Sequence, residues 1–174
     1  MKIGIISDTH DCIKNTLRAF EYLNKNEVEL VLHCGDWVAP FMLEATKKLN
    51  CPIKAVFGNN EGARYPYFEK IKREGLNIEL GDEGVWEGDY DNKRIAITHG
   101  HQPIILKLLI DSGKYDLVAS GHTHMANIEM SNKTTHVNPG AIMGAKKLDI
   151  FDKFTLALYD TETNRPEIVY LDNK

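Results

Sequence analysis

Short groups of histidine, aspartate and asparagine follow five apolar runs in this sequence. The densest group, Gly121-His122-Thr123-His124, comes soon after the apolar run Tyr115–Ala119. Two imidazoles one residue apart at the end of a strand converge naturally on a metal ion. The spacing therefore predicts metal chemistry in the loop after this run.

Four further runs end in the same kinds of side chain. They lead into Ser7-Asp8-Thr9-His10, His33-Cys34-Gly35-Asp36, Gly58-Asn59-Asn60-Glu61 and Thr98-His99-Gly100-His101. Each group alone has a structural explanation, because Asp8 or Asp36 can cap a helix and an asparagine pair after a glycine can form a tight turn. Five such groups in one chain are better explained by a shared metal site.

Seven side chains of these groups are the candidate metal ligands. They are Asp8, His10, Asp36, Asn59, His99, His122 and His124. Seven ligands without sulfur exceed a tetrahedral zinc site, but they fit two divalent ions that share one carboxylate, for which we predict Asp36. Mixed nitrogen and oxygen ligation suits manganese, the ion we expect, and also nickel, zinc, cobalt and iron.

The charge of such a site indicates its substrate. Two divalent ions bring four positive charges, of which Asp8 and Asp36 cancel two and a bridging hydroxide cancels one. The remaining positive charge would attract a phosphoryl group although the whole chain has a net charge of -4. Because metal-bound water loses a proton near neutral pH, hydrolysis would need no serine or cysteine nucleophile.

The elements that must position these groups change in type along the chain. The first half alternates strands and helices, which predicts parallel pairing with helical crossovers. Its elements are strands at Lys2–Ser7, Glu29–Leu32 and Ile53–Phe57 and helices at Ile13–Lys25, Pro40–Leu49 and Tyr67–Arg73. In α/β architecture, functional groups lie at the carboxyl ends of strands, where the five groups fall.

The second half is rich in short strands. They are predicted at Val85–Glu87, Arg94–Thr98, Ala126–Ser131, Thr134–Asn138, Phe154–Tyr159 and Glu167–Leu171, with one helix at Ile104–Ile110. Two sheets packed face to face with helices outside would place both halves around one core.

In order and spacing, the five motifs D-x-H, G-D, G-N-N-E, H-G-H and G-H-T-H resemble those of the calcineurin-like metallophosphoesterase superfamily. The compact size and the segment Asn138-Pro139-Gly140 resemble its small bacterial and archaeal phosphodiesterases, and the resemblance runs from Lys2 to about Tyr159. It implies a four-layer α/β/β/α sandwich of two mixed β-sheets flanked by helices, with a dimetal site at one edge.

The resemblance also implies how the ligands divide and what they do. One ion would be held by Asp8, His10, Asp36 and His124, and the other by Asp36, Asn59, His99 and His122. The implied enzyme is a phosphodiesterase in which bridging hydroxide attacks the phosphorus of a small phosphate ester. A phosphomonoesterase or nuclease on the same site and a non-catalytic protein-binding scaffold of the same fold are the alternatives.

One position departs from the family pattern. Many relatives carry a histidine after the motif asparagine, near the substrate, whereas this chain has Asn60. An amide donates a hydrogen bond but cannot act as an acid near pH 7, which favours substrates with a good leaving group, such as aryl or nucleotide diesters. His101 is the candidate replacement, and a histidine that orients a ligand or faces outward is the alternative. Asn60 and His101 are therefore the catalytic candidates.

Four other polar residues have structural explanations that we prefer. His33 is predicted to be a packed or hydrogen-bonded residue at a strand end, and His136 a strand surface residue. Arg64 is near enough to Asn59 in sequence to reach a phosphate, but we expect it to face solvent. Glu61 is expected to orient the Asn59 loop or, alternatively, to cap a helix.

Composition limits the classes of protein further. A chain of 174 residues with 43% hydrophobic and 26% charged residues fits a single domain, residues 1–174, which the resemblance identifies as a metallophosphoesterase domain. The net charge of -4 predicts no extended nucleic-acid surface. Three cysteines without a C-x-x-C pair argue against a disulfide framework, and no apolar run is long enough for a membrane span or signal peptide. We expect a cytoplasmic protein, and homo-oligomerisation is left open.

Overall fold

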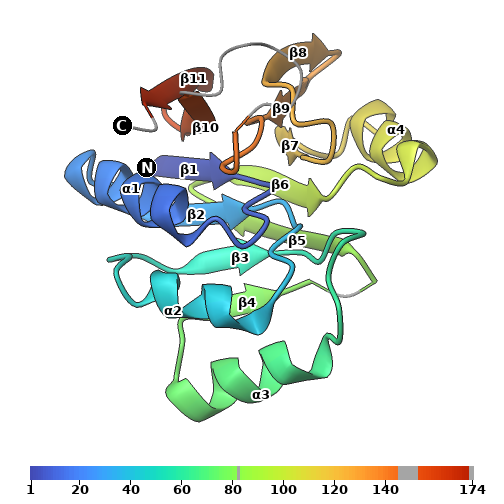
Figure 1. Ribbon diagram of the computed structural model, residues 1–174. Coiled ribbons are helices and arrows are strands. Elements are labelled where there is room, and N and C mark those ends of the chain that lie inside the picture. Colours follow the sequence, from blue (N-terminus) through green and yellow to red (C-terminus); the bar gives the residue numbers. More distant parts are fainter. Residues whose placement is uncertain (82, 145–152, 173–174) are drawn as a thin grey trace.

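Two β-sheets pack face to face, with helices on both outer faces (Figure 1). The computed structural model describes residues 1–81, 83–144 and 153–172. The predicted four-layer α/β/β/α sandwich is confirmed.

Among the described residues, no helix is both long enough and apolar enough to span a membrane.

In the described part of the chain, the first sheet has six strands in the order β11-β10-β1-β2-β3-β4. Its strands are β1 (Lys2–Ile6), β2 (Leu30–His33), β3 (Ile53–Ala55), β4 (Ile78–Leu80), β10 (Lys153–Asp160) and β11 (Arg165–Asp172). Strands β1 to β4 are parallel, as the alternating first half predicts, and β10 is antiparallel to β1. Strand β4 was not predicted.

Within the described ranges, four helical segments accompany this sheet. They are α1 (Ile13–Lys25), the 3₁₀ helix η1 (Pro40–Met42), α2 (Leu43–Thr46) and α3 (Tyr65–Glu74). Buried side chains of these helices, such as Phe20 and Tyr67, share a hydrophobic cluster with outward-facing strand residues such as Ile6 and Val31. This cluster fixes the outer helical layer on the first sheet.

The second sheet has five described strands in the order β5-β6-β7-β9-β8. They are β5 (Val85–Tyr90), β6 (Lys93–Thr98), β7 (Leu117–Ala119), β8 (Asn127–Ser131) and β9 (Thr134–Asn138). Helix α4 (Pro103–Asp111) covers the outer face, with Leu106 and Leu109 against Val118. The inner faces of both sheets meet in a second cluster that includes Ile3, Leu32, Ile97, Leu117 and Val137.

Two expectations from sequence are wrong. The predicted helix Pro40–Leu49 is a 3₁₀ turn followed by a four-residue helix that ends at Thr46. There the Thr46 hydroxyl donates a hydrogen bond to the Leu43 carbonyl at 2.7 Å, and Lys47–Leu49 continue as turns. His136 is not on the surface but is 8% exposed, because α4 packs on β9 and Ser120 Oγ lies 2.8 Å from its Nε2 atom.

The three cysteines are free thiols. Cys34 is buried, and Cys12 and Cys51 are half-buried. Burial raises the pKa of the Cys51 thiol to about 11, so that it stays protonated near neutral pH.

Candidate metal centre

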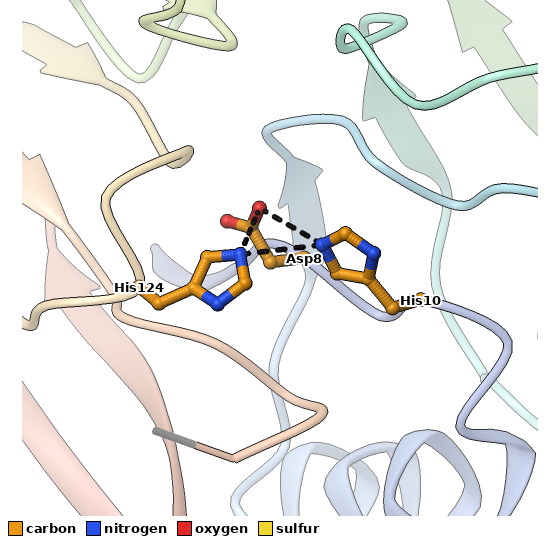
Figure 2. Close-up of side chains that lie close together, drawn as sticks. All are labelled: Asp8, His10 and His124. Carbon is orange, nitrogen blue, oxygen red and sulfur yellow. Dashed lines mark hydrogen bonds and ion pairs between the residues drawn. The ribbon is translucent and has the colours of Figure 1, made fainter. Parts of the chain in front are cut away.

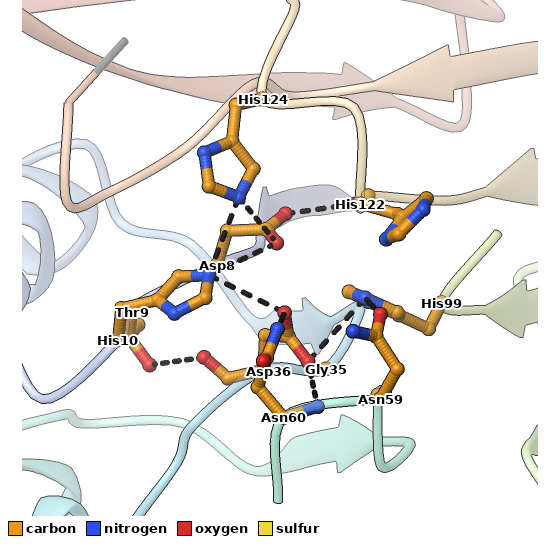
Figure 3. Close-up of polar contacts among 12 residues, drawn as sticks. Asp8, Thr9, His10, Gly35, Asp36, Asn59, Asn60, His99, His122 and His124 are labelled. Carbon is orange, nitrogen blue, oxygen red and sulfur yellow. Dashed lines mark hydrogen bonds and ion pairs between the residues drawn. The ribbon is translucent and has the colours of Figure 1, made fainter. Parts of the chain in front are cut away.

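Loops from both sheets meet at one end of the sandwich (Figure 3). Asp8 and His10 follow β1, Asp36 follows β2, Asn59 follows β3, His99 follows β6, and His122 and His124 follow β7. Backbone hydrogen bonds join neighbouring loops, from Asp8 N to Gly35 O at 3.0 Å and from Gly121 N to His99 O at 2.9 Å. The predicted ligands are thus brought together by the carboxyl ends of parallel strands.

Five of these residues have left-handed backbone conformations, which are uncommon outside glycine. The φ angles are 53° at Asp8, 40° at His10, 59° at Asp36, 69° at His122 and 59° at His124. Such conformations persist where surrounding contacts impose them, and they concentrate at functional sites. The left-handed conformations therefore cost local stability, and they direct these side chains into the site.

One compact group consists of Asp8, His10 and His124, whose nearest ligand atoms all lie within 4.8 Å of one another (Figure 2). The Oδ1 atom of Asp8 lies 3.1 Å from His124 Nε2 and 3.6 Å from His10 Nε2, and the two Nε2 atoms are 3.2 Å apart. This oxygen is buried and has no hydrogen-bond donor among the described residues. A cation between these three atoms would satisfy all of them.

The second compact group contains Asp8, Asp36 and His99. His99 Nδ1 lies 2.7 Å from the Cys34 carbonyl, which only accepts, so Nδ1 must carry the hydrogen. In neutral His99 the lone pair of Nε2 then faces two further acceptors, Asn59 Oδ1 at 3.0 Å and Asp36 Oδ1 at 3.4 Å. Three acceptor atoms that converge in this way require a proton or a metal ion between them.

His122 approaches the site differently from the other candidates. Its ring centroid lies 5.2 Å from that of His99, and its backbone N–H donates to Asp8 Oδ2 at 3.0 Å. The imidazole belongs to neither compact group in the described part of the chain. Its ring therefore borders the His99 side of the site, whereas its backbone fixes Asp8.

The carboxylates and imidazoles strongly stabilise one another's charged forms. Burial opposes the charged form of Asp8, but His10 and His124 hold the pKa of its carboxyl well below the usual range. Burial likewise opposes charge on Asp36, and His10 and His99 lower its pKa even further. The ion pairs of His10, first with Asp36 and then with Asp8, raise its pKa to about 9. The site therefore holds positive charge beside two ionised carboxylates.

The two catalytic candidates contact the site in different ways. Asn60 donates to both oxygens of Asp36, from its backbone N–H at 2.9 Å and from its side-chain Nδ2 at 2.6 Å. The His101 ring lies 5.4 Å from the ring of His99 and 6.2 Å from that of His122. Burial and then these two histidines lower the pKa of His101. Asn60 thus orients a carboxylate, while His101 borders the site as a neutral base near pH 7.

Glu61 orients the Asn59 loop, as predicted, because its two carboxylate oxygens accept hydrogen bonds from the backbone N–H groups of Trp37 and Gly58. Arg64 is exposed, and its guanidinium lies 5.1 Å from the centroid of the Phe57 ring.

Two glycines are necessary to the site and were not identified from sequence. A Cβ atom at Gly58 would lie 2.2 Å from Asp36 Oδ1, and one at Gly121 would lie 1.8 Å from Ser7 Oγ and 2.7 Å from Asp8 Oδ2. Only glycine lets these loops approach the carboxylates so closely. The available signal was that each glycine directly precedes a candidate ligand.

His33 lies beneath the site as a packed residue, which confirms the prediction. Its ring is fully buried and stacks on Trp37 with centroids 3.6 Å apart and an interplanar angle of 9°. Its Nδ1 atom accepts a hydrogen bond from Gly35 N at 3.1 Å. Burial lowers the pKa of His33 to about 3.

This buried histidine predicts acid sensitivity. The pKa of His33 is lower in the folded chain than the value of about 6.5 in the unfolded chain, so the unfolded chain takes up the proton first as the pH falls. Its contribution to stability is present above pH 6.5 and is lost towards pH 3. Between pH 7 and pH 5 it should cost about 2 kcal/mol of unfolding free energy.

The measurement is urea unfolding at both pH values, with chelator present, for the unsubstituted protein and for His33→Gln. The variant should be less stable at pH 7 but should lose about 2 kcal/mol less on acidification. Equal pH dependence of both proteins would contradict the assignment of this proton uptake to His33.

Comparisons with known proteins agree with this geometry. A family model described as the calcineurin-like phosphoesterase superfamily domain matches residues 1–164. Phosphodiesterase MJ0936 of Methanocaldococcus jannaschii is 40% identical over 144 residues, which cover 83% of this chain and 86% of that protein. A solved structure of an archaeal phosphodiesterase has a TM-score of 0.87 at 35% identity, covering 98% of this chain and 100% of the other.

A more distant structure shares the fold alone. Vps29 of Entamoeba histolytica, crystallised with Zn²⁺, has a TM-score of 0.61 at 16% identity, and the match covers 100% of both chains. At this level of identity the likeness concerns architecture and says nothing about activity.

Proposed function

This chain belongs to the calcineurin-like phosphoesterase superfamily, and we propose that its hydrolysis of phosphodiesters depends on two divalent ions, with manganese expected, held where the two sheets meet. The observation that carries the proposal is the position of Asp36. Its Oδ2 atom lies 3.3 Å from His10 Nε2, and its Oδ1 atom lies 3.4 Å from His99 Nε2. One carboxylate thus faces the histidines of both groups, which supports its role as the shared ligand.

We divide the remaining ligands between the two ions. We assign Asp8, His10 and His124 to the ion on one side of Asp36, because their ligand atoms form one compact group. On the other side we assign Asn59, His99 and His122, because Asn59 Oδ1 and the His122 ring both lie next to His99.

When bound, such ions supply a hydroxide-like nucleophile near neutral pH and neutralise charge on the phosphoryl oxygens. The protein supplies orientation. Cys34 O holds the His99 ring in the tautomer that leaves Nε2 free, and Asn60 fixes both oxygens of Asp36. His101 is placed to accept a hydrogen bond from substrate or water. Because its pKa is lowered, it would be a weak proton donor at pH 7, which favours diesters with good leaving groups.

The test compares substrates and metals directly. Metal-stripped protein is assayed on bis-aryl phosphates, mono-aryl phosphates and cyclic nucleotides, with each divalent metal added back separately. We expect manganese to restore diester hydrolysis, with a monoester rate at most about a tenth of the diester rate. Hydrolysis of monoesters but not diesters would favour a phosphomonoesterase. Inactivity with every metal would favour the protein-binding scaffold.

A further inference from the structure

The segment Asn138-Pro139-Gly140 lies at the end of β9, next to the loop that carries His122 and His124. Asn138 is only 4% exposed, and its side chain points at this loop rather than at solvent. Buried amides need hydrogen-bond partners, so the partners of Asn138 indicate what the residue does.

The amide of Asn138 connects the loop of His122 and His124 with the turn at Gly140. Its Nδ2 atom donates to the Gly121 carbonyl at 2.7 Å and to Thr123 Oγ1 at 3.1 Å. Its Oδ1 atom accepts the N–H of Gly140 at 3.0 Å. Gly140 has a φ of 79°, and a Cβ atom there would lie 2.1 Å from Thr155 Oγ1, so the turn that fixes the Asn138 side chain depends on glycine.

The loop needs external support because of its conformation. His122 and His124 both have left-handed φ angles, and Thr123 lies between them. Asn138 donates hydrogen bonds to the loop just before His122, at Gly121 O, and again between the histidines, at Thr123 Oγ1. Two further hydrogen bonds tie the loop to its surroundings, from Gly121 N to His99 O and from His122 N to Asp8 Oδ2.

We propose that Asn138 is a positioning residue that holds both loop histidines in the orientation required by the two ions. The inference rests on the proposed function, since it assigns His122 and His124 to different ions. One buried amide would then control the affinity of both ions without touching either. Residues that orient metal ligands typically change metal affinity or activity by 10- to 100-fold when they are replaced.

The experiment uses the full chain with Mn²⁺ as the probe. Asn138→Ala removes both contacts with the loop. Thr123→Val keeps the contact with Gly121 O but removes the one between the histidines, together with the hydrogen bond that Thr123 Oγ1 accepts from Met125 N at 3.3 Å. The matched control is Thr134→Val, at the opposite end of the same strand, where the fully buried Thr134 hydroxyl donates to Tyr115 O at 2.8 Å. The control also loses a buried hydrogen bond to a backbone carbonyl, but far from the ligand loop.

Metal binding is measured by calorimetry, stability by urea unfolding in chelator, and KM and kcat at saturating Mn²⁺. We expect the dissociation constant for Mn²⁺ to rise about 10- to 100-fold in Asn138→Ala, by less in Thr123→Val, and not at all in Thr134→Val. KM at saturating Mn²⁺ should stay within about twofold, because no substrate contact changes.

An unchanged dissociation constant in Asn138→Ala, or in Thr123→Val if the alanine variant does not fold, would overturn the positioning role even if stability falls. An equal rise in Thr134→Val would also overturn it, because the effect would then follow general destabilisation. Failure of the unsubstituted protein to bind Mn²⁺ at all would overturn the proposed function and this inference together.

Discussion

Asp36→Asn is expected to lower phosphodiester turnover at least about 100-fold and to reduce bound metal towards one ion or none. Asp36 faces His10 through Oδ2 and His99 through Oδ1, so neutralising it weakens both groups at once. Replacing residues that only orient a ligand costs 10- to 100-fold, and loss of a shared ligand should cost more. The measurements are kcat/KM on a bis-aryl phosphate and the ratio of metal to protein in the purified, metal-loaded chain.

The control for this substitution is Asp89→Asn, which makes the same chemical change at an exposed position on β5. It should leave both metal content and turnover unchanged, because exposed charges contribute little. If Asp36→Asn retained both metals and full turnover, the shared-carboxylate role would be wrong.

Gly58→Ala should disrupt the centre although it removes no ligand. The added Cβ would lie 2.2 Å from Asp36 Oδ1 and 2.8 Å from the backbone nitrogen of Asp36, and the backbone cannot move aside without shifting the loop. We expect turnover to fall at least about 10-fold and unfolding free energy to fall by about 1–3 kcal/mol. Steady-state kinetics, metal content and urea unfolding measure these effects.

Gly62→Ala is the matched control in the same loop. A Cβ atom at Gly62 would meet no other atom within 4 Å, and its φ angle is not in the left-handed range. It should therefore preserve turnover and stability. Wild-type metal content and activity in Gly58→Ala would show that the close approach of this loop to Asp36 is not required.

The general position of the centre was predictable because apolar strands are easy to read and their carboxyl ends share an edge. Asp8, Asp36 and His99 come soon after such strands. Parallel pairing of β1 with β2 brings Asp8 and Asp36 together, and the packing of the two sheets against each other brings His99 to them. The direction of individual side chains was not predictable in this way. Whether the Asn60 amide faces substrate or Asp36 depends on contacts between loops 24 residues apart in sequence.

The local sequence pattern also could not predict which side chains are buried on the outer faces of the sheets. His136 lies in the run Thr134–Asn138, where alternation suggests one exposed side, but α4 covers that side. The early end of α2 has a similar origin, since the Thr46 hydroxyl competes for a helix carbonyl. The burial of His136 and the end of α2 thus depend on contacts with other groups, which the periodicity of apolar residues in the sequence does not reveal.

The centre draws its side chains from both sheets, with Asp8 and Asp36 on one and His99, His122 and His124 on the other (Figure 3). Each cation would then act as a reversible cross-link between the two layers, as a disulfide does covalently in secreted domains. Unfolding must break this link, so resistance to heat would depend on the free ion concentration, gaining about 1.4 kcal/mol for every tenfold excess above the dissociation constant. A shortage of free metal would therefore lower the stability of the fold as well as the hydrolytic activity.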